Sequence, residues 1–166
     1  MMMNSASFKV VALLASVLAL AACSKKTTPD LEAGTGLGAG SGAAPGSKSQ
    51  FETEVGDRIY FLVDQTNLTQ EAQGTLTRQA QWLQQYPAVT VQVEGHADER
   101  GTREYNISLS ARRATATREF LIQNGVPGNR ISSIAYGKER PAALCDEEQC
   151  WSQNRRSVTV ITGGTN

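Results

Sequence analysis

The distribution of apolar residues divides the chain into three parts. Residues 10–22 form an apolar run that ends in small side chains. Residues 24–50 consist mostly of Gly, Ala, Ser and Thr and include no aromatic residue. From residue 51 onward, short apolar runs alternate with patterns of helical period. This last part is long enough for one hydrophobic core, so we expect one folded domain over 51–166.

Four stretches of this domain have the composition of β-strands. Residues 89–94 alternate valine with Thr, Gln and Glu, which is the period of a strand with one buried face. The other three stretches are short, apolar in part and β-prone: 58–63, 130–136 and 157–162.

Two longer stretches predict helices. The first begins at a potential N-cap, Thr69, and runs to Tyr86, where Pro87 ends it. Its apolar positions recur on one face, at Ala72, Leu76, Ala80 and Leu83.

The second helix is expected from its N-cap, Thr102, to about Asn124, with Gly125 as its stop. The core-facing residues of this helix are predicted to be Leu109, Ala116 and Phe120. A short helical turn is expected over 151–154. Because strands and helices alternate, we predict an α/β sandwich in which helices cover one face of a small mixed sheet of four strands.

The apolar run near the start is typical of an export signal. Its 13 residues are too few to span a bilayer at about 1.5 Å per residue, which argues against a transmembrane helix. The run ends in Leu-Ala-Ala-Cys at 20–23, which resembles the lipobox of bacterial lipoproteins. That resemblance implies a signal peptide over 1–22, lipidation of Cys23 and, because Ser24 follows, sorting to the outer membrane. An ordinary secretory signal with an incidental cysteine is the alternative.

The Gly-rich segment after the lipobox is expected to be a flexible tether. Residues 23–50 cannot bury enough apolar surface to offset the entropy of ordering them. As a coil, a segment of this length spans roughly 30 Å. A lipid anchor on such a tether implies a target away from the membrane surface.

The two remaining cysteines, Cys145 and Cys150, form an even pair. In an oxidising compartment such a pair predicts a disulfide. A zinc site is the alternative, but the chain has one histidine and lacks the usual ligand spacing, so we expect no metal.

Net charge excludes one class of partner. Removal of residues 1–22 removes Lys9, so the rest of the chain holds 15 basic and 16 acidic residues, a formal charge of minus one. No basic stripe of the kind that binds nucleic acid is visible, so we expect no nucleic-acid partner.

Charged residues concentrate between the second strand and the second long helix. The segment 94–113 holds residues of both signs, including His96, Asp98, Glu99 and Arg113. Loops that follow a strand are where binding groups collect, so the segment is a candidate site. Binding, cleavage and a merely solvated loop remain the alternatives at this point.

Several ordered motifs resemble the OmpA-like peptidoglycan-binding domain, over essentially all of residues 51–162. These are Gly-His-Ala-Asp-Glu-Arg-Gly-Thr at 95–102, Tyr-Asn at 105–106, Leu-Ser-x-x-Arg-Ala at 109–114 and Asn-Arg-Arg at 154–156. The resemblance implies an outer-membrane lipoprotein that binds peptidoglycan non-covalently, without a cofactor, and supports envelope integrity and constriction during cell division. It also implies partners in the Tol system, notably TolB.

The same resemblance implies which residues hold the ligand, the free end of meso-diaminopimelate in the stem peptide. Asp98 and Arg113 are the principal pair; the pocket would further be lined by Phe61, Asp64, Thr102 and Asn106. The chemistry agrees, because a carboxylate accepts an ammonium group and a guanidinium binds a carboxylate through two parallel hydrogen bonds. A structural Asp98–Arg113 salt bridge is the alternative.

Other polar residues of this region have less defined roles. An enzyme would need His96, Asp98 and Glu99 as acid, base or metal ligands, but no nucleophile or second base is spaced to work with His96, so we expect no catalysis. Neighbours on a helix point about 100° apart, so Arg112 and Arg113 are not expected to face one small pocket. We expect Arg112 at the surface or facing a partner. For Arg155 and Arg156 the alternatives are to brace the domain or to brace the ligand-facing loop, and the sequence assigns no role to Arg100.

Overall fold

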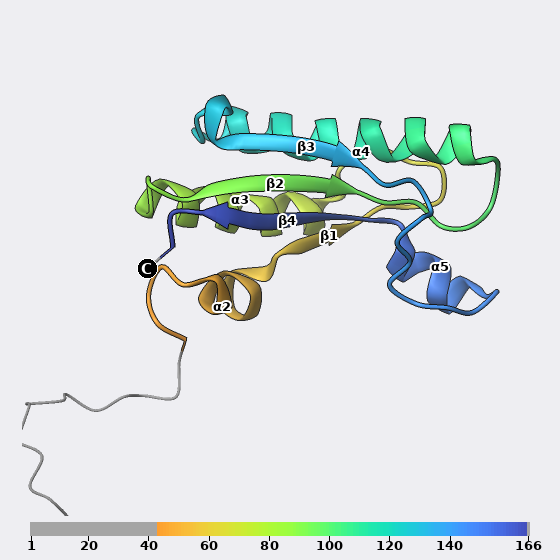
Figure 1. Cartoon of the computed structure of the whole chain (residues 1–166), viewed down its shortest axis with the longest axis horizontal. Coiled ribbons are helices and arrows are strands. Elements are labelled where there is room, and N and C mark those ends of the chain that lie inside the picture. Colours follow the sequence, from red (N-terminus) through yellow and green to blue (C-terminus); the bar gives the residue numbers. More distant parts are fainter. Residues whose placement is uncertain (1–42, 166) are drawn as a thin grey trace, which may run out of the picture. The chain divides into compact units, whose positions relative to one another are not determined.

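A four-stranded mixed sheet is the centre of the computed structural model, which describes residues 43–165 (Figure 1). Its strands are β1 Arg58–Tyr60, β2 Thr90–Gly95, β3 Ile131–Ala135 and β4 Arg156–Gly163. The strand order is β1-β4-β2-β3. β2 and β3 are parallel, whereas β4 is antiparallel to both β1 and β2. The predicted mixed sheet of four strands is confirmed.

Two long helices, α3 and α4, pack on the sheet. They span Gln70–Gln85 and Arg103–Gln123. Both begin at the predicted N-caps, because Thr69 Oγ1 accepts from Ala72 N and Thr102 Oγ1 accepts from Tyr105 N, each at 3.2 Å. The shorter elements are α2 Lys48–Gln50, the π-helical turn η1 Phe51–Gly56, the 3-10 turn η2 Gly128–Arg130 and α5 Glu148–Asn154.

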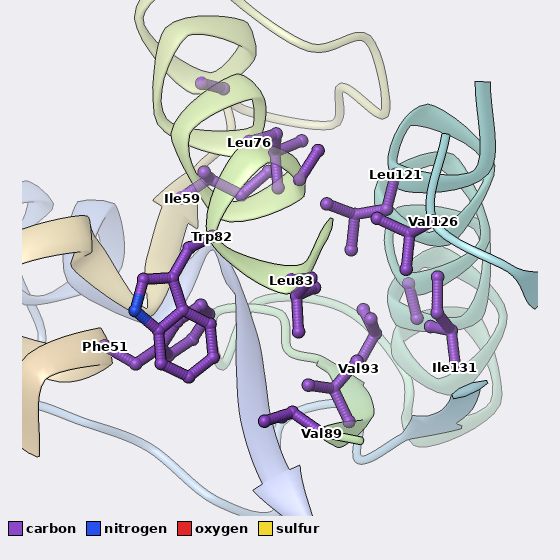
Figure 2. Close-up of a cluster of buried hydrophobic side chains, with 14 of the residues drawn as sticks. Phe51, Ile59, Leu76, Trp82, Leu83, Val89, Val93, Leu121, Val126 and Ile131 are labelled. Carbon is purple, nitrogen blue, oxygen red and sulfur yellow. The ribbon is translucent and has the colours of Figure 1, made fainter. Parts of the chain in front are cut away.

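The hydrophobic core lies between the sheet and the two long helices (Figure 2). Sheet residues such as Val91 and Val93 meet Leu76 and Leu83 of α3 and Leu121 of α4, all almost fully buried. The four core positions predicted for the first helix are all buried. One buried face of the sheet therefore confirms the predicted sandwich.

The inward face of α4 agrees with the prediction in part. Leu109 is buried and Phe120, partly buried, packs against the core as expected, whereas Ala116 is only partly buried. The buried face is instead largely polar: Asn106, Ser110, Arg113 and Thr117, with Leu109, Ala114 and Leu121. These polar groups are tolerated inside because they are hydrogen-bonded; Ser110 Oγ, for example, accepts from Gly137 N at 2.9 Å. A pattern based on apolar residues alone therefore missed the polar part of this buried face.

The first strand is shorter than predicted. It ends at Tyr60 rather than at residue 63, because the chain turns where Gln65 N donates to Leu62 O. Asp64 in this turn has a φ of 56°, a left-handed conformation. The turn leaves the carbonyl oxygens of Leu62 and Gln65 free of the sheet and available to other donors.

Gly95 permits the close approach of α4 to β2. A Cβ atom at this position would lie 1.9 Å from the carbonyl oxygen of Ser110. Any side chain here would force the helix away from the strand. The segment that follows, from His96, is thereby held directly beside the first half of α4.

Part of the sequence lies outside the described residues. The expected signal peptide, the lipidated Cys23 and most of the expected tether fall within 1–42 and are not described. At the end of the expected tether, Lys48–Gln50 forms α2, capped by Ser47, and Gln50 accepts a hydrogen bond from Trp82 at 3.0 Å. Within residues 43–165, no helix is long and apolar enough to cross a membrane.

Candidate ligand-binding site

A cavity of about 310 Å³ opens where the turn after β1, the loop after β2 and the N-terminal half of α4 meet. It is lined by Val63, Asp64, Asp98, Arg100, Gly101, Tyr105, Asn106, Leu109 and Arg113. Four of the six predicted ligand-pocket residues are among them. The tertiary fold therefore brings together groups that lie as far apart in sequence as Asp64 and Arg113.

Arg113 is a buried cation fixed by backbone oxygens. Its side chain is 0% exposed, and its three nitrogen atoms donate to Gln65 O, His96 O and Leu62 O at 3.0, 2.9 and 3.3 Å. Burial lowers the pKa of Arg113 to about 10, so the group stays charged at neutral pH. In the part of the chain described, it forms no ion pair with a carboxylate. A buried guanidinium without a carboxylate partner can donate hydrogen bonds to an anionic ligand group and neutralise its charge.

Asp98 lines the same cavity but is paired elsewhere. Its Oδ2 accepts from Arg100 Nη2 at 2.6 Å and from Arg155 Nη1 at 3.3 Å, and its Oδ1 accepts from the Arg100 backbone at 3.2 Å. Burial by itself would raise the pKa of Asp98, but the hydrogen bonds from Arg100 and Arg155 outweigh it and hold the pKa below its usual value. The carboxylate is therefore ionised, and its Oδ1 retains room for a second donor.

The alternative of an Asp98–Arg113 salt bridge is not what the structure shows, since the two side chains have separate partners. Arg155 and Arg100, whose roles the sequence left open, are the partners of Asp98. The Asn-Arg-Arg motif at 154–156 pointed to Arg155. Its contact with Asp98, 57 positions away in the chain, could not be predicted from residue spacing.

Helix α5 contacts these two arginines through Glu148 and Trp151. Glu148 forms an ion pair with Arg155, and the Arg100 guanidinium lies 4.3 Å from the centre of the Trp151 ring. Trp151 Nε1 also donates to Glu99 Oε1 at 2.8 Å. The contacts of Glu99 and Arg100 with Trp151 therefore join the loop after β2 to α5.

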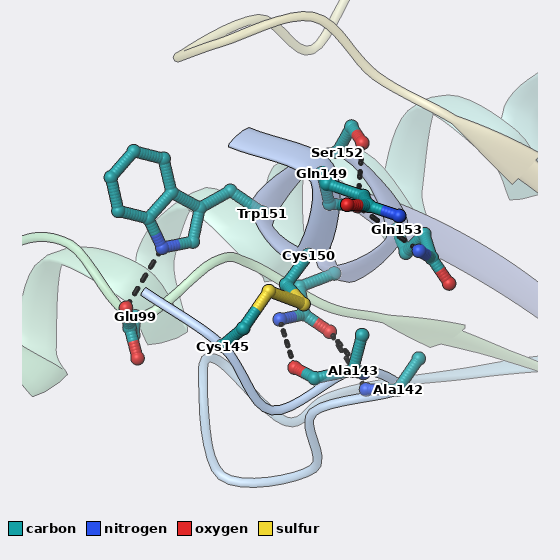
Figure 3. The surroundings of a disulfide bond; sticks show 10 residues. Glu99, Ala142, Ala143, Cys145, Gln149, Cys150, Trp151, Ser152 and Gln153 are labelled. Carbon is teal, nitrogen blue, oxygen red and sulfur yellow. Dashed lines mark hydrogen bonds between the residues drawn. A yellow bond between two sulfur atoms is a disulfide. The ribbon is translucent and has the colours of Figure 1, made fainter. Parts of the chain in front are cut away.

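The predicted disulfide between Cys145 and Cys150 is present, with a Cα–Cα distance of 5.6 Å (Figure 3). Its second cysteine belongs to α5. The side chain of Asn154, at the other end of α5, accepts from Ala142 N and Ala143 N at 2.7 and 3.1 Å. Both sulfur atoms are used by the disulfide, so the zinc alternative for this pair is wrong.

The four remaining predicted pocket residues divide into two groups. Asp64 lines the cavity and accepts a hydrogen bond from the Tyr105 hydroxyl; Asn106 lines it and donates to Arg100 O at 2.8 Å. Thr102 acts as the α4 cap, and Phe61 lies with its ring centre 5.1 Å from the Arg113 guanidinium, but neither lines this cavity. Phe61 instead lines a neighbouring cavity of about 380 Å³.

Three lining residues that were not predicted for the pocket give it an apolar surface: Val63, Tyr105 and Leu109. Val63 and Tyr105 are 50% and 43% exposed. Tyr105 belongs to the Tyr-Asn motif at 105–106, and this motif could have pointed to it as a pocket residue. Val63 was expected to belong to a strand, so its position at the cavity depends on the turn that ends β1.

His96 does not share the cavity. It is 1% exposed, its ring centre lies 5.5 Å from that of Tyr136, and within residues 43–165 neither ring nitrogen has a hydrogen-bond partner. Burial, together with Arg156 and Arg140, lowers the pKa of His96 to about 4 and outweighs the Glu94 carboxylate 3.6 Å away. Of the three residues that the enzyme alternative requires, Asp98 alone lines the cavity.

Arg112 is exposed and donates to Ser108 Oγ at 2.7 Å, so it faces away from Arg113, as predicted. Arg156 is 8% exposed and donates to Arg140 O at 3.1 Å. Its position on β4 places it beside His96 rather than at the cavity. These two arginines therefore lie outside the candidate site.

Comparison with known proteins places the chain among cell-envelope proteins. The model of the OmpA family matches residues 60–155. A peptidoglycan-associated lipoprotein of Rhizobium meliloti is 59% identical over 155 residues, which cover 93% of this chain and 88% of the relative. One from Brucella melitensis is 57% identical over 88% of this chain and 87% of the relative. One from Haemophilus influenzae is 38% identical over 86% and 90%.

Solved structures show the same fold. The crystal structure of the peptidoglycan-associated lipoprotein from Burkholderia pseudomallei matches with a TM-score of 0.64 and 34% identity, covering 67% of this chain and 96% of that one. The C-terminal domain of MotB from Helicobacter pylori matches with a TM-score of 0.61 and 27% identity, covering 64% and 84%. These matches confirm the fold and the resemblance expected from the sequence.

Proposed function

This chain belongs to the OmpA family and, within it, to the peptidoglycan-associated lipoproteins; from that premise we propose that it binds peptidoglycan non-covalently. The ligand is the free end of meso-diaminopimelate in the stem peptide. Arg113 binds its carboxylate and Asp98 accepts its ammonium. The protein binds the cell wall and does not hydrolyse it.

One observation carries this proposal: a buried guanidinium that pairs with no carboxylate of residues 43–165 and an ionised carboxylate line one cavity. Arg113 has five N–H donors and uses three for carbonyl oxygens, which leaves one on each Nη atom. Two such donors are what a bidentate pair with a carboxylate needs. A zwitterionic amino-acid centre supplies both the anion for Arg113 and the cation for Asp98.

The chemistry of the site supports the proposed absence of catalysis. A general acid or base needs a pKa near the working pH and contact with the substrate. His96 has a pKa of about 4 and lies away from the cavity, and the pKa of Asp98 is held low. Both observations support a binding role.

The membrane end of the protein is proposed from the sequence. Cys23 carries the lipid, the anchor lies in the outer membrane, and the tether lets the domain reach the wall from the periplasmic side. A Cys23→Ser variant is expected to fractionate with soluble periplasmic proteins. Its continued recovery with membranes would contradict lipid anchoring through this residue.

We also propose that the domain takes part in the Tol system, with TolB as a partner, in support of envelope integrity and of constriction during division. The observation that favours a protein partner is the apolar surface beside the cavity. Leu62, Val63 and Tyr105 are 63%, 50% and 43% exposed. Clustered exposed apolar side chains mark docking surfaces. Pull-down of TolB by the wild-type domain, and loss of it with Leu62→Ser, tests this partner.

The binding proposal is tested with purified diaminopimelate-type peptidoglycan and the domain over residues 43–166. Wild-type protein should sediment with the wall, and Asp98→Asn should stay in the supernatant. Asp146→Asn, an exposed aspartate in the loop before α5, is the matched control and should sediment normally. Sedimentation of Asp98→Asn at the wild-type level would contradict the site. Release of soluble muropeptides by the wild type would contradict the non-enzymatic role.

A further inference from the structure

Glu148 of α5 lies behind the candidate site and does not line its cavity. Its two carboxylate oxygens face Arg155, one of them at 3.4 Å from Nη1 and the other bonded to Nη2. Arg155 in turn donates to Asp98 Oδ2. Glu148 is therefore linked to the ligand-facing carboxylate through one guanidinium.

Glu148 is one of the carboxylates that offset the cations at and behind the cavity. The cations are Arg100, Arg113 and Arg155; the carboxylates are Asp64, Asp98, Glu99 and Glu148. The Arg155 side chain is 5% exposed, so its charge is poorly screened by water and acts strongly on its neighbours.

Removal of Glu148 would change this balance in a defined direction. Asp98 would become the remaining carboxylate partner of Arg155, while it also pairs with Arg100. One negative charge would then face two cations, and the potential at Asp98 would become more positive. That change disfavours a ligand ammonium and leaves the carboxylate at Arg113 unaffected or more tightly held.

We propose that Glu148 is a specificity-determining positioning residue, which sets the preference of the site for a zwitterionic amino-acid centre over a simple carboxylate. The proposal rests on the function proposed above. Glu148 acts by neutralising Arg155, so that Asp98 keeps its capacity for an ammonium group. The Cys145–Cys150 disulfide and Asn154 hold the short helix that presents it.

The test uses three synthetic stem tetrapeptides that differ at the third residue. Meso-diaminopimelate carries both charged groups, 2-aminopimelate carries the distal carboxylate without the ammonium, and lysine carries the ammonium without the carboxylate. Their affinities are measured for wild type, Glu148→Gln, Glu148→Asp and Glu147→Gln by calorimetry at low salt. Glu147→Gln removes the same charge from the neighbouring exposed residue and is the matched control.

Glu148→Gln should bind the diaminopimelate peptide about two- to fivefold more weakly, the range of a partly exposed ion pair, since the Glu148 side chain is 59% exposed. Its affinity for the aminopimelate peptide should be unchanged or higher, so the ratio of the two affinities falls. Glu148→Asp should recover much of the ratio, and Glu147→Gln should keep it. The difference should shrink at high salt.

Three outcomes contradict the proposal. An unchanged ratio in Glu148→Gln contradicts it while leaving the site itself in place. An equal loss for all three peptides together with a lower melting temperature assigns Glu148 a structural role instead. A wild-type protein that binds none of the peptides contradicts both this inference and the proposed function.

Discussion

Asp98 and Arg113 line one cavity without pairing with each other. Arg113 is held by three backbone carbonyl oxygens, and Asp98 is held by Arg100 and Arg155. Each therefore keeps its orientation without a ligand. A site built in this way does not need to break an internal salt bridge before it binds a zwitterion, which reduces the cost of binding.

Arg113→Lys should abolish binding of the diaminopimelate peptide and also destabilise the fold. Lysine keeps the charge but cannot donate to three carbonyl oxygens and a carboxylate in fixed directions. Buried carbonyl groups that lose their donors cost about 1–3 kcal/mol. Calorimetric titration and urea unfolding measure the two effects. Arg112→Lys, at the exposed neighbouring position, should change neither binding nor stability. If Arg113→Lys binds the peptide with the wild-type affinity, the role assigned to Arg113 is contradicted.

The stability of the domain should fall between pH 6.5 and pH 4 because of His96. Its pKa is about 4 in the folded protein and about 6.5 in the unfolded chain, so the unfolded state binds more protons in this window. The full effect corresponds to roughly 3 kcal/mol, present above pH 6.5 and lost as the pH falls.

Urea unfolding of wild type and of His96→Phe, at steps from pH 7.5 to pH 4, checks this dependence. Phenylalanine fills the same space against Tyr136 but does not titrate. The variant should therefore lose less stability across the window, while carboxylates contribute equally to both proteins. Parallel curves for the two proteins would show that His96 is not the responsible group.

Gly95→Ala should destabilise the domain strongly, by about 3 kcal/mol or more, because the added Cβ meets the carbonyl oxygen of Ser110 at 1.9 Å. Gly74→Ala is the opposite case. Gly74 lies on α3 with nothing within 4 Å of an added Cβ, so alanine should stabilise the helix by about 0.5–1 kcal/mol. Thermal unfolding of both variants tests the pair, and similar melting temperatures would contradict the close α4–β2 contact.

Reduction of the Cys145–Cys150 disulfide should lower the free energy of unfolding by about 2 kcal/mol, since it closes a short loop. The double variant Cys145→Ser, Cys150→Ser should show the same loss without reductant. Addition of reductant should have no further effect on that variant. If wild type unfolds at the same urea concentration with and without reductant, the disulfide does not stabilise the folded domain.

Much of the fold could be predicted because local chemistry and tertiary packing agree. Thr69 and Thr102 are good N-caps in any context, and the alternating valines of β2 require one buried face. The cysteine pair and the ordered motifs around Asp98 and Arg113 were equally visible. Where packing opposed the local pattern, the prediction fell short: it missed the polar residues buried on the inner face of α4, and it made β1 three residues too long.

The sequence by itself determined the order of the four strands and two long helices, the disulfide pair and the two residues at the centre of the candidate site. Only the tertiary structure decided how those two residues are held. Arg113 reaches Leu62 and Gln65 across about 50 positions, and Arg155 reaches Asp98 across 57. Such contacts depend on how distant strands and loops are placed side by side. Residue spacing along the chain does not contain that information.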